Sequence, residues 1–199
     1  MTADHRVREA GRADLPRLAP MLAAAFQDDP VMAYIFPDPA VRRARLPRFL
    51  SVIFKSDLPA GACFMTENAE AATTWRAPGR GHLSFREMLQ QAWPWVASSG
   101  VALPRALIVS AASDANHPEE PHWYLHIAGC APQAQGRGFG SAVIRAGLAR
   151  SDADGVPAYL ETANEANLAV YGALGFQITH RWTVKDGPQC WSMLRKSRR

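Results

Sequence analysis

A glycine-rich segment in the second half of the chain constrains the fold more than any other feature. Residues 123–130 are an aromatic and β-branched run, which predicts a buried strand that ends at Ala131-Pro132. The next residues spell Gln135-Gly136-Arg137-Gly138-Phe139-Gly140 and remove side chains where a helix must begin. The backbone N–H groups of such a loop lack intrahelical partners and lie at the positive end of the helix dipole. The segment therefore predicts a phosphate or pyrophosphate site.

Periodicity along the rest of the chain predicts an α+β order. Alternating or continuous apolar runs predict further strands over residues 7–10, 62–66, 71–75, 157–162, 176–184 and 190–194. Helical spacing predicts helices over residues 15–26, 41–58, 85–98, 103–112, 139–152 and 168–175. Residues 31–39 either form a short core helix or supply aromatic side chains to a pocket. The strand, loop, helix and strand within 123–162 form a crossover, so we expect a central mixed sheet.

Composition bounds the remaining possibilities. A chain of 199 residues with 48% hydrophobic content is enough for one domain with a proper core, which we expect to span residues 1–199. Charged residues throughout the first thirty positions exclude a signal-peptide hydrophobic region, so a soluble, cytoplasmic protein is expected. Cys63, Cys130 and Cys190 fit neither a disulfide framework nor a zinc site.

The basic charge comes from one end of the chain. The net charge is +4, and four of the last five residues are Lys or Arg, so the chain without this tail is neutral. We expect a solvated tail rather than nucleic-acid binding.

Two other phosphate-binding folds compete for the glycine loop. A dinucleotide-binding fingerprint needs Gly-x-Gly-x-x-Gly, and Ser141 stands where the third glycine would be. That motif also belongs at the first crossover of a repeated array, whereas most of this chain precedes it. A P-loop is excluded because no Gly-Lys-Ser/Thr follows a glycine run.

The loop resembles the acetyl-coenzyme A signature Gln-x-x-Gly-x-Gly of the GCN5-related N-acetyltransferase (GNAT) superfamily. A second block of that family looks similar to Leu160-Glu161-Thr162 followed by Asn167, Tyr171 and Gly175-Phe176. The resemblance implies a mixed, mostly antiparallel, twisted sheet flanked by helices, with acetyl-CoA as the acyl donor. Within the family, residues 23–31, 119–144, 155–176 and 187–196 look most like the puromycin N-acetyltransferase group.

The resemblance also implies which residues hold the cofactor. The backbone of the strand end would bind the pantetheine arm, the loop amides would bind the pyrophosphate, and one helix residue would reach the pantetheine. These residues are Ala128, Gly129 and Cys130 for the strand, Gln135, Gly136, Arg137, Gly138, Gly140 and Ser141 for the loop, and Asn167 for the helix.

For catalysis, the resemblance implies Tyr171 as the acid that protonates the departing thiolate, with the Cys130 N–H polarising the thioester oxygen. Glu161 is the first candidate for the base. His122 and His126, which share a strand face with Tyr124, are the alternatives. Aromatic candidates for an acceptor pocket, of which at most two are expected to line it, are Tyr34, Trp75, Trp93, Trp95 and Trp191.

The expected function is acetyl-CoA-dependent N-acetylation of a small primary amine, possibly including an antibiotic of the puromycin kind, by direct transfer. One alternative is a non-catalytic acetyl-CoA sensor or interaction module. Another is acetylation of protein N-termini or lysines, which would need an open peptide groove. We expect no nucleic acid, membrane or metal partner, and the sequence is compatible with a homodimer.

Overall fold

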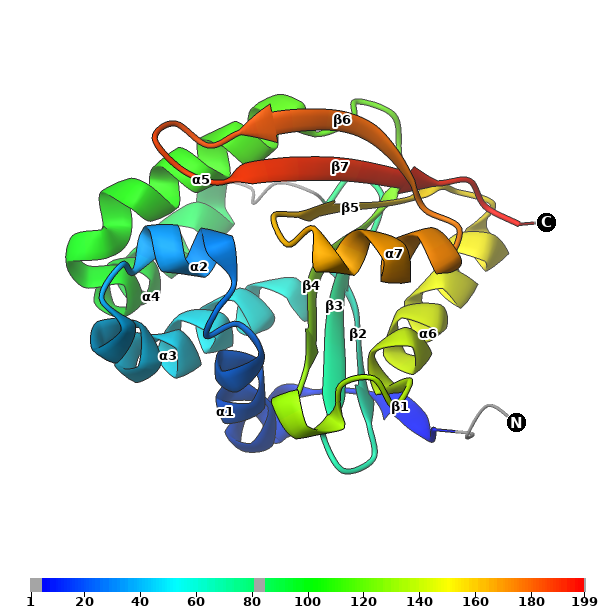
Figure 1. The fold of residues 1–199 in the computed structure, drawn as a ribbon, viewed down its shortest axis with the longest axis horizontal. Helices are drawn as coiled ribbons and strands as arrows, with labels where there is room; N and C mark the ends of the chain where they lie inside the picture. Colours follow the sequence, from blue (N-terminus) through cyan, green and yellow to red (C-terminus); the bar gives the residue numbers. More distant parts are fainter. Residues whose placement is uncertain (1–4, 81–84, 199) are drawn as a thin grey trace.

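The computed structural model describes residues 5–80 and 85–198, with the side chains of residues 85–91 excepted. A single seven-stranded sheet has the strand order β1-β2-β3-β4-β5-β7-β6 (Figure 1). Its strands are β1 (Val7–Glu9), β2 (Gly61–Thr66), β3 (Ala71–Arg76), β4 (Trp123–Cys130), β5 (Ala158–Thr162), β6 (Gln177–Thr183) and β7 (Gln189–Arg195). Only the β4–β5 pair is parallel among the described pairs. The prediction of a mixed, mostly antiparallel sheet is confirmed.

Helices cover both faces of the sheet (Figure 1). They are α1 (Leu15–Ala25), α2 (Pro30–Ile35), α3 (Pro39–Asp57), α4 (Phe85–Ser99), α5 (Leu103–Asn116), α6 (Phe139–Asp154) and α7 (Ala166–Ala173). Helix α6 packs on β2, β3 and β4, whereas α1 and α3 pack on the opposite face. The predicted strands and helices are present, and residues 31–39 resolve mainly into the short helix α2.

Helix ends differ from the prediction by up to four residues. Helix α5 continues past the predicted end at Ala112 to Asn116. Asn167 does not cap α7: the N-cap residue is Glu165, and the Asn164 side chain just before it accepts the Ala166 N–H at 3.1 Å. Asn167 lies in the first turn of α7, where its side chain is free of a capping role.

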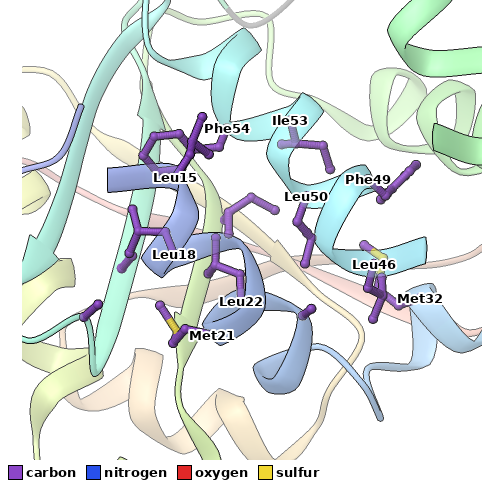
Figure 2. Close-up of a cluster of buried hydrophobic side chains, with 14 of the residues drawn as sticks. Leu15, Leu18, Met21, Leu22, Met32, Leu46, Phe49, Leu50, Ile53 and Phe54 are labelled. Carbon is purple, nitrogen blue, oxygen red and sulfur yellow. The ribbon is translucent and has the colours of Figure 1, made fainter. Parts of the chain in front are cut away.

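The apolar faces of α1, α2 and α3 form one hydrophobic core against the sheet. Figure 2 shows side chains of α1 and α3 pointing toward one another across this core. Leu18, Leu22, Leu46 and Leu50 are almost completely buried there. At roughly 1.5–3 kcal/mol for each fully buried side chain of this size, this cluster fixes the position of α1 and α3 on the sheet.

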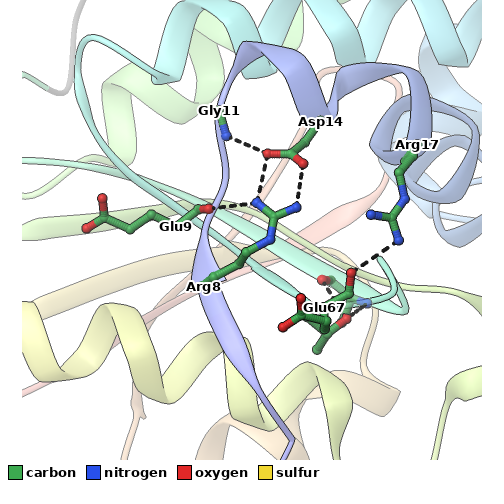
Figure 3. Close-up of polar contacts among 8 residues, drawn as sticks. Arg8, Glu9, Gly11, Asp14, Arg17 and Glu67 are labelled. Carbon is green, nitrogen blue, oxygen red and sulfur yellow. Dashed lines mark hydrogen bonds and ion pairs between the residues drawn. The ribbon is translucent and has the colours of Figure 1, made fainter.

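Polar contacts tie β1 to the start of α1 (Figure 3). The Arg8 guanidinium donates to both carboxylate oxygens of Asp14, at 2.5 and 3.0 Å, and the Gly11 N–H donates to the same carboxylate. This carboxylate therefore anchors the turn before α1 instead of capping the helix. The hydrogen bond from Arg8 lowers the pKa of Asp14 to about 2.

The basic C-terminal residues are not simply a solvated tail, which corrects the prediction. Arg195 belongs to β7, is 4% exposed, and forms a bidentate ion pair with Asp152 of α6 at 2.8 and 2.9 Å. The Arg198 N–H donates to the same carboxylate at 2.6 Å. The charge of Arg195 and the backbone of Arg198 thus lie against the body of the domain.

One helical stretch, Ala92–Asn116, is long and apolar enough to cross a membrane by length and composition alone. It joins the end of α4 to α5 through a 3-10 turn at Gly100, whose φ is +56°. Trp93 is 76% exposed and Val101 is 94% exposed. The expectation that the protein does not bind membranes therefore stays a prediction.

The face of the sheet that α6 covers contains a close contact, which explains why residue 147 is glycine. Trp75 of β3 is fully buried beneath α6, and a Cβ atom on Gly147 would lie 2.0 Å from Cε2 of its ring. Helix α6 approaches the sheet this closely only because residue 147 is glycine. Trp75 is thus a core residue, which corrects its assignment as a candidate for the acceptor pocket.

We predict that Gly147→Ala destabilises the protein by about 1–3 kcal/mol, because the ring has no room to move. A thermal unfolding scan should show a melting temperature lower by several degrees. The matched control is Gly172→Ala in α7, where nothing lies within 4 Å of the added Cβ. The control should be neutral or slightly stabilised. A Gly147→Ala protein as stable as the wild type would contradict this packing.

Candidate active site

The site begins where β4 separates from β5 (Figure 1). The parallel pairing of the two strands ends at Leu125↔Leu160, whereas β4 stays paired with β3 as far as Cys130↔Ala71. The β5-facing backbone of the remaining β4 residues is thus unpaired within the described sheet. This is the splayed strand end that the resemblance implied for Ala128, Gly129 and Cys130.

A β-bulge accompanies this separation. Ile127 pairs with Thr74 and Leu125 pairs with Trp75, which leaves His126 as an extra residue on β4. A bulge of this kind bends the strand and redirects a side chain. His126 consequently faces the same side as Ile127, toward the cavity described below.

The predicted phosphate loop has the expected backbone. Gly136 and Gly138 adopt φ values of +72° and +89°, a region that favours glycine. The Ala142 N–H donates to the Gly138 carbonyl at 3.0 Å, so the amides of residues 136–141 precede the hydrogen-bond ladder of α6. A Cβ on Gly136 would meet nothing within 4 Å. This open, donor-rich turn fits a pyrophosphate group.

Several side chains of the loop are occupied by contacts within the protein. The Gln135 amide donates to the Cys130 carbonyl at 3.3 Å, and the Arg137 guanidinium lies over the Phe139 ring at 5.1 Å. His5, which the sequence did not single out, stacks on Phe139 and bonds the Arg137 carbonyl at 2.7 Å. Nothing in the sequence near His5 marks this long-range contact.

Gly129 has a packing role that the sequence could not reveal. A Cβ there would lie 2.6 Å from Cδ2 of Leu22 in α1. The absent side chain makes room for α1, so any contact of Gly129 with a cofactor would come from its backbone.

A cavity of about 650 Å³ lies beside the separated strands. Its apolar walls come from α2, α3, α4 and α5, and include Met32, Phe49, Trp95 and Leu107. Its polar wall includes the residues Asp29, Ser113, Asp114, His117, His126, Glu161, Asn167 and Tyr171. The structure thus brings Ala128, Glu161, Asn167 and Tyr171, which the sequence singled out separately, to one cavity.

Glu161 is a half-buried carboxylate on the cavity wall. It accepts hydrogen bonds from the Ser113 hydroxyl at 2.5 Å and from the Tyr159 hydroxyl at 2.7 Å. Burial raises its pKa to about 7, although these two donors act in the opposite direction. The side chain therefore changes protonation state near neutral pH. The sequence did not single out Ser113, because the helix predicted over residues 103–112 ends just before it.

Tyr171 is 8% exposed and lines the same cavity from α7. Burial, with a further contribution from Asp29, raises its pKa to about 12. The phenol thus keeps its proton at neutral pH, and is a weaker acid than an exposed tyrosine. Within the described part of the chain no side chain or backbone group hydrogen-bonds its hydroxyl, which leaves the hydroxyl available to a ligand.

The other candidates divide between the cavity and the rest of the molecule. His126 lines the cavity, whereas His122 lies outside it and bonds His117 at 2.9 Å between their Nε2 atoms. Of the five aromatic candidates, the cavity lining includes only Trp95. Trp93 points into solvent and Trp191 is buried elsewhere. The Tyr34 hydroxyl donates to the Lys185 carbonyl.

Comparison with known protein families identifies the class. Residues 79–176 match the Acetyltransferase (GNAT) family. The chain therefore carries an acetyltransferase domain of the GNAT family, whose acyl donor is acetyl-CoA.

Two curated relatives are mycothiol acetyltransferases. That of Streptomyces coelicolor is 31% identical over 144 residues, which cover 68% of this chain and 45% of that protein. That of Salinispora arenicola is 30% identical over 198 residues, which cover 83% of this chain and 61% of that protein. This chain spans about half the length of these relatives.

Solved structures share the fold. The histone acetyltransferase HPA2 and related acetyltransferase from Corynebacterium glutamicum has a TM-score of 0.70 and 23% identity, covering 98% of this chain and 97% of that chain. The ribosomal-protein-S18-alanine N-acetyltransferase from Escherichia coli has a TM-score of 0.56 and 14% identity, covering 98% and 96%. At these identities the likeness establishes the fold alone.

We predict that Gly138→Ala weakens acetyl-CoA binding, because an alanine at φ +89° costs about 1–2 kcal/mol in the conformation that aims the loop amides. Calorimetric titration should give a Kd about 5–30 times higher. Gly11→Ala is the control, since Gly11 has φ −124° and nothing within 4 Å of an added Cβ. An unchanged Kd in Gly138→Ala would contradict the assignment of the loop.

Proposed function

We propose that this protein transfers an acetyl group from acetyl-CoA to a primary amine of a small molecule, by direct transfer in a ternary complex. One observation carries the proposal: Glu161 and Tyr171 line the same cavity, which lies beside the unpaired end of β4. A proton acceptor and a proton donor thus share the space in which an amine could meet a thioester.

In the proposed cofactor site, backbone groups make most of the contacts with acetyl-CoA. The unpaired backbone of Ala128, Gly129 and Cys130 would bind the pantetheine arm, with Asn167 reaching it from α7. The amides of Gly136 to Ser141 would bind the pyrophosphate at the start of α6. Bound acetyl-CoA supplies the electrophilic thioester carbonyl.

The cavity supports a small, cationic acceptor with an apolar body. A volume of about 650 Å³ is in the range of small-molecule sites. The carboxylates Asp29, Asp114 and Glu161 on its wall favour an ammonium group. Side chains of α4 and α5 cover the cavity, which favours a small molecule over a peptide lying in an open groove.

Several small amines are candidates for the acceptor. The likeness to mycothiol acetyltransferases makes unacetylated mycothiol a second candidate. Puromycin remains a prediction of the sequence that the relatives described above do not support. A homodimer, a cytoplasmic location and a single domain over residues 1–199 likewise remain predictions.

The chain's own groups account for the proton movements. Glu161, with its pKa of about 7, takes a proton from the arriving ammonium. Tyr171 holds its proton until a thiolate forms beside it. Although burial weakens this phenol as an acid, a thiolate in the same buried space is also more basic than in water.

The decisive assay is release of free thiol from acetyl-CoA by purified protein. The amine panel should include puromycin, unacetylated mycothiol, aminoglycosides, polyamines and short peptides, with calorimetric titration of acetyl-CoA in parallel. Thiol release with one small-amine class supports the proposal. Acetyl-CoA binding without turnover on any amine would favour the sensor alternative, and turnover only on peptides would favour a protein acetyltransferase.

We predict that Tyr171→Phe lowers kcat at least about hundredfold, because the departing thiolate loses its proton donor. The Kd for acetyl-CoA should be unchanged. Tyr34→Phe is the matched control, since the Tyr34 hydroxyl bonds the Lys185 carbonyl outside the cavity. Equal turnover in Tyr171→Phe and wild type would remove the proposed acid.

We predict that kcat/KM rises with pH through about 7 and then levels off, because Glu161 accepts a proton only when it is itself deprotonated. The ionisation of an ordinary amine, near ~10, lies well apart. Glu161→Gln should abolish this rise and lower kcat/KM about hundredfold. Glu9→Gln, at an exposed pair with Arg150, is the control. Persistence of the same rise in Glu161→Gln would assign it to another group.

A further inference from the structure

A buried carboxylate next to the cavity has no role in the function proposed above. Asp57, at the end of α3, is fully buried. It accepts hydrogen bonds from the Thr74 hydroxyl at 2.5 Å and the Arg76 Nε at 2.8 Å. The Nδ1 atom of His126 lies 2.8 and 3.1 Å from its two oxygens. Residues of two neighbouring strands, β3 and β4, thus converge on this one carboxylate of α3.

The contact with Asp57 fixes the tautomer of His126. Burial works against the charged carboxylate, but His126, Arg76 and Thr74 together keep the pKa of Asp57 below its usual range. A deprotonated carboxylate only accepts hydrogen bonds, so the proton of neutral His126 must reside on Nδ1. The lone pair is then on Nε2, at the edge of the ring that points away from Asp57.

The Nε2 atom is available to a ligand. His126 lines the cavity, and no described side chain or backbone group hydrogen-bonds its Nε2 atom. The β-bulge places this ring on the cavity side of β4. A proton acceptor of fixed orientation therefore faces the space assigned to the amine.

His126 and Glu161 belong to one wall of the cavity. Tyr124 lies between them, with its ring centroid 5.2 Å from that of His126 and 5.8 Å from that of Tyr159. Tyr159 in turn donates to Glu161 at 2.7 Å. Strands β4 and β5 thus present two different proton acceptors to the same cavity.

We propose that His126 is a second catalytic proton acceptor for the attacking nitrogen, and that Asp57 is the positioning residue that holds it. The inference rests on the proposed acetyl transfer. An ammonium substrate must lose two protons to become an amide, whereas one carboxylate takes up only one. With a second acceptor in the site, Glu161 does not have to release its first proton before the nitrogen loses its second one.

The proton balance is as follows. Glu161 takes one proton from the ammonium, and the neutral amine attacks the thioester carbonyl to form the C–N bond. The nitrogen, now positively charged, gives a proton to Nε2 of His126. The C–S bond breaks and the thiolate takes the Tyr171 proton. One of the two protons on Glu161 and His126 then returns to Tyr171, and the other leaves to water.

The test compares His126→Gln, Asp57→Asn and the double variant in amine-dependent thiol release. Glutamine fills the space but takes up no proton, so kcat should fall about hundredfold with an unchanged Kd for acetyl-CoA. Asp57→Asn should cause a similar loss, and the double variant should be no more than about threefold worse than the lower single variant, because both act on one imidazole. His180→Gln, at an exposed position of β6, is the control.

A second measurement does not depend on turnover or on the stability of a variant. Nitrogen NMR of the wild-type protein with labelled histidine should show neutral His126 protonated at Nδ1. The opposite tautomer would overturn the inference, as would a His126→Gln protein within about threefold of an active wild type. Absence of turnover in the wild type, by contrast, contradicts the proposed acetyl transfer itself.

Discussion

The site depends on the point at which β4 leaves β5. Three residue pairs hold these strands in parallel register up to Leu125, after which β4 follows β3 alone. The extra residue His126 sits at this point, so one bulge both frees backbone groups and turns an imidazole toward the cavity. The packing of α1 against Gly129 and of α6 against Trp75 holds β4 in this path from both faces. Hydrophobic packing thus places the polar site.

The carboxylates of Asp57 and Glu161, both near the cavity, have different partners within the protein. Asp57 forms an ion pair with Arg76 and accepts a hydrogen bond from His126, and its pKa stays low. Among the described residues, the donors to Glu161 are the hydroxyl groups of Ser113 and Tyr159, and burial raises its pKa. A carboxylate that lacks a protein cation is stabilised when a ligand brings one. This difference fits the two roles that we propose: Asp57 holds His126 in place, whereas Glu161 contacts the substrate.

Much of this arrangement was predictable from local sequence. The glycine spelling of residues 135–140 and the apolar periodicities define the loop, the strands and the helices, because both are local properties of the chain. The family resemblance marked Glu161 and Tyr171. Contacts between distant segments were not predictable: Ser113 on Glu161, His5 on the loop, and Asp57 on His126 each depend on the assembled fold. The same reason explains the error on Trp75, since a buried aromatic under α6 and a pocket aromatic look alike in sequence.

The central claim is that the unpaired end of β4 binds the acyl donor so that its thioester faces the cavity with Glu161 and Tyr171. The most direct measurement is a crystal structure with a non-transferable thioether analogue of acetyl-CoA. The account predicts the pyrophosphate on the amides of residues 136–141, the pantetheine along β4, and the sulfur within hydrogen-bond distance of the Tyr171 hydroxyl. An analogue bound elsewhere, or a sulfur directed away from the cavity, would contradict it.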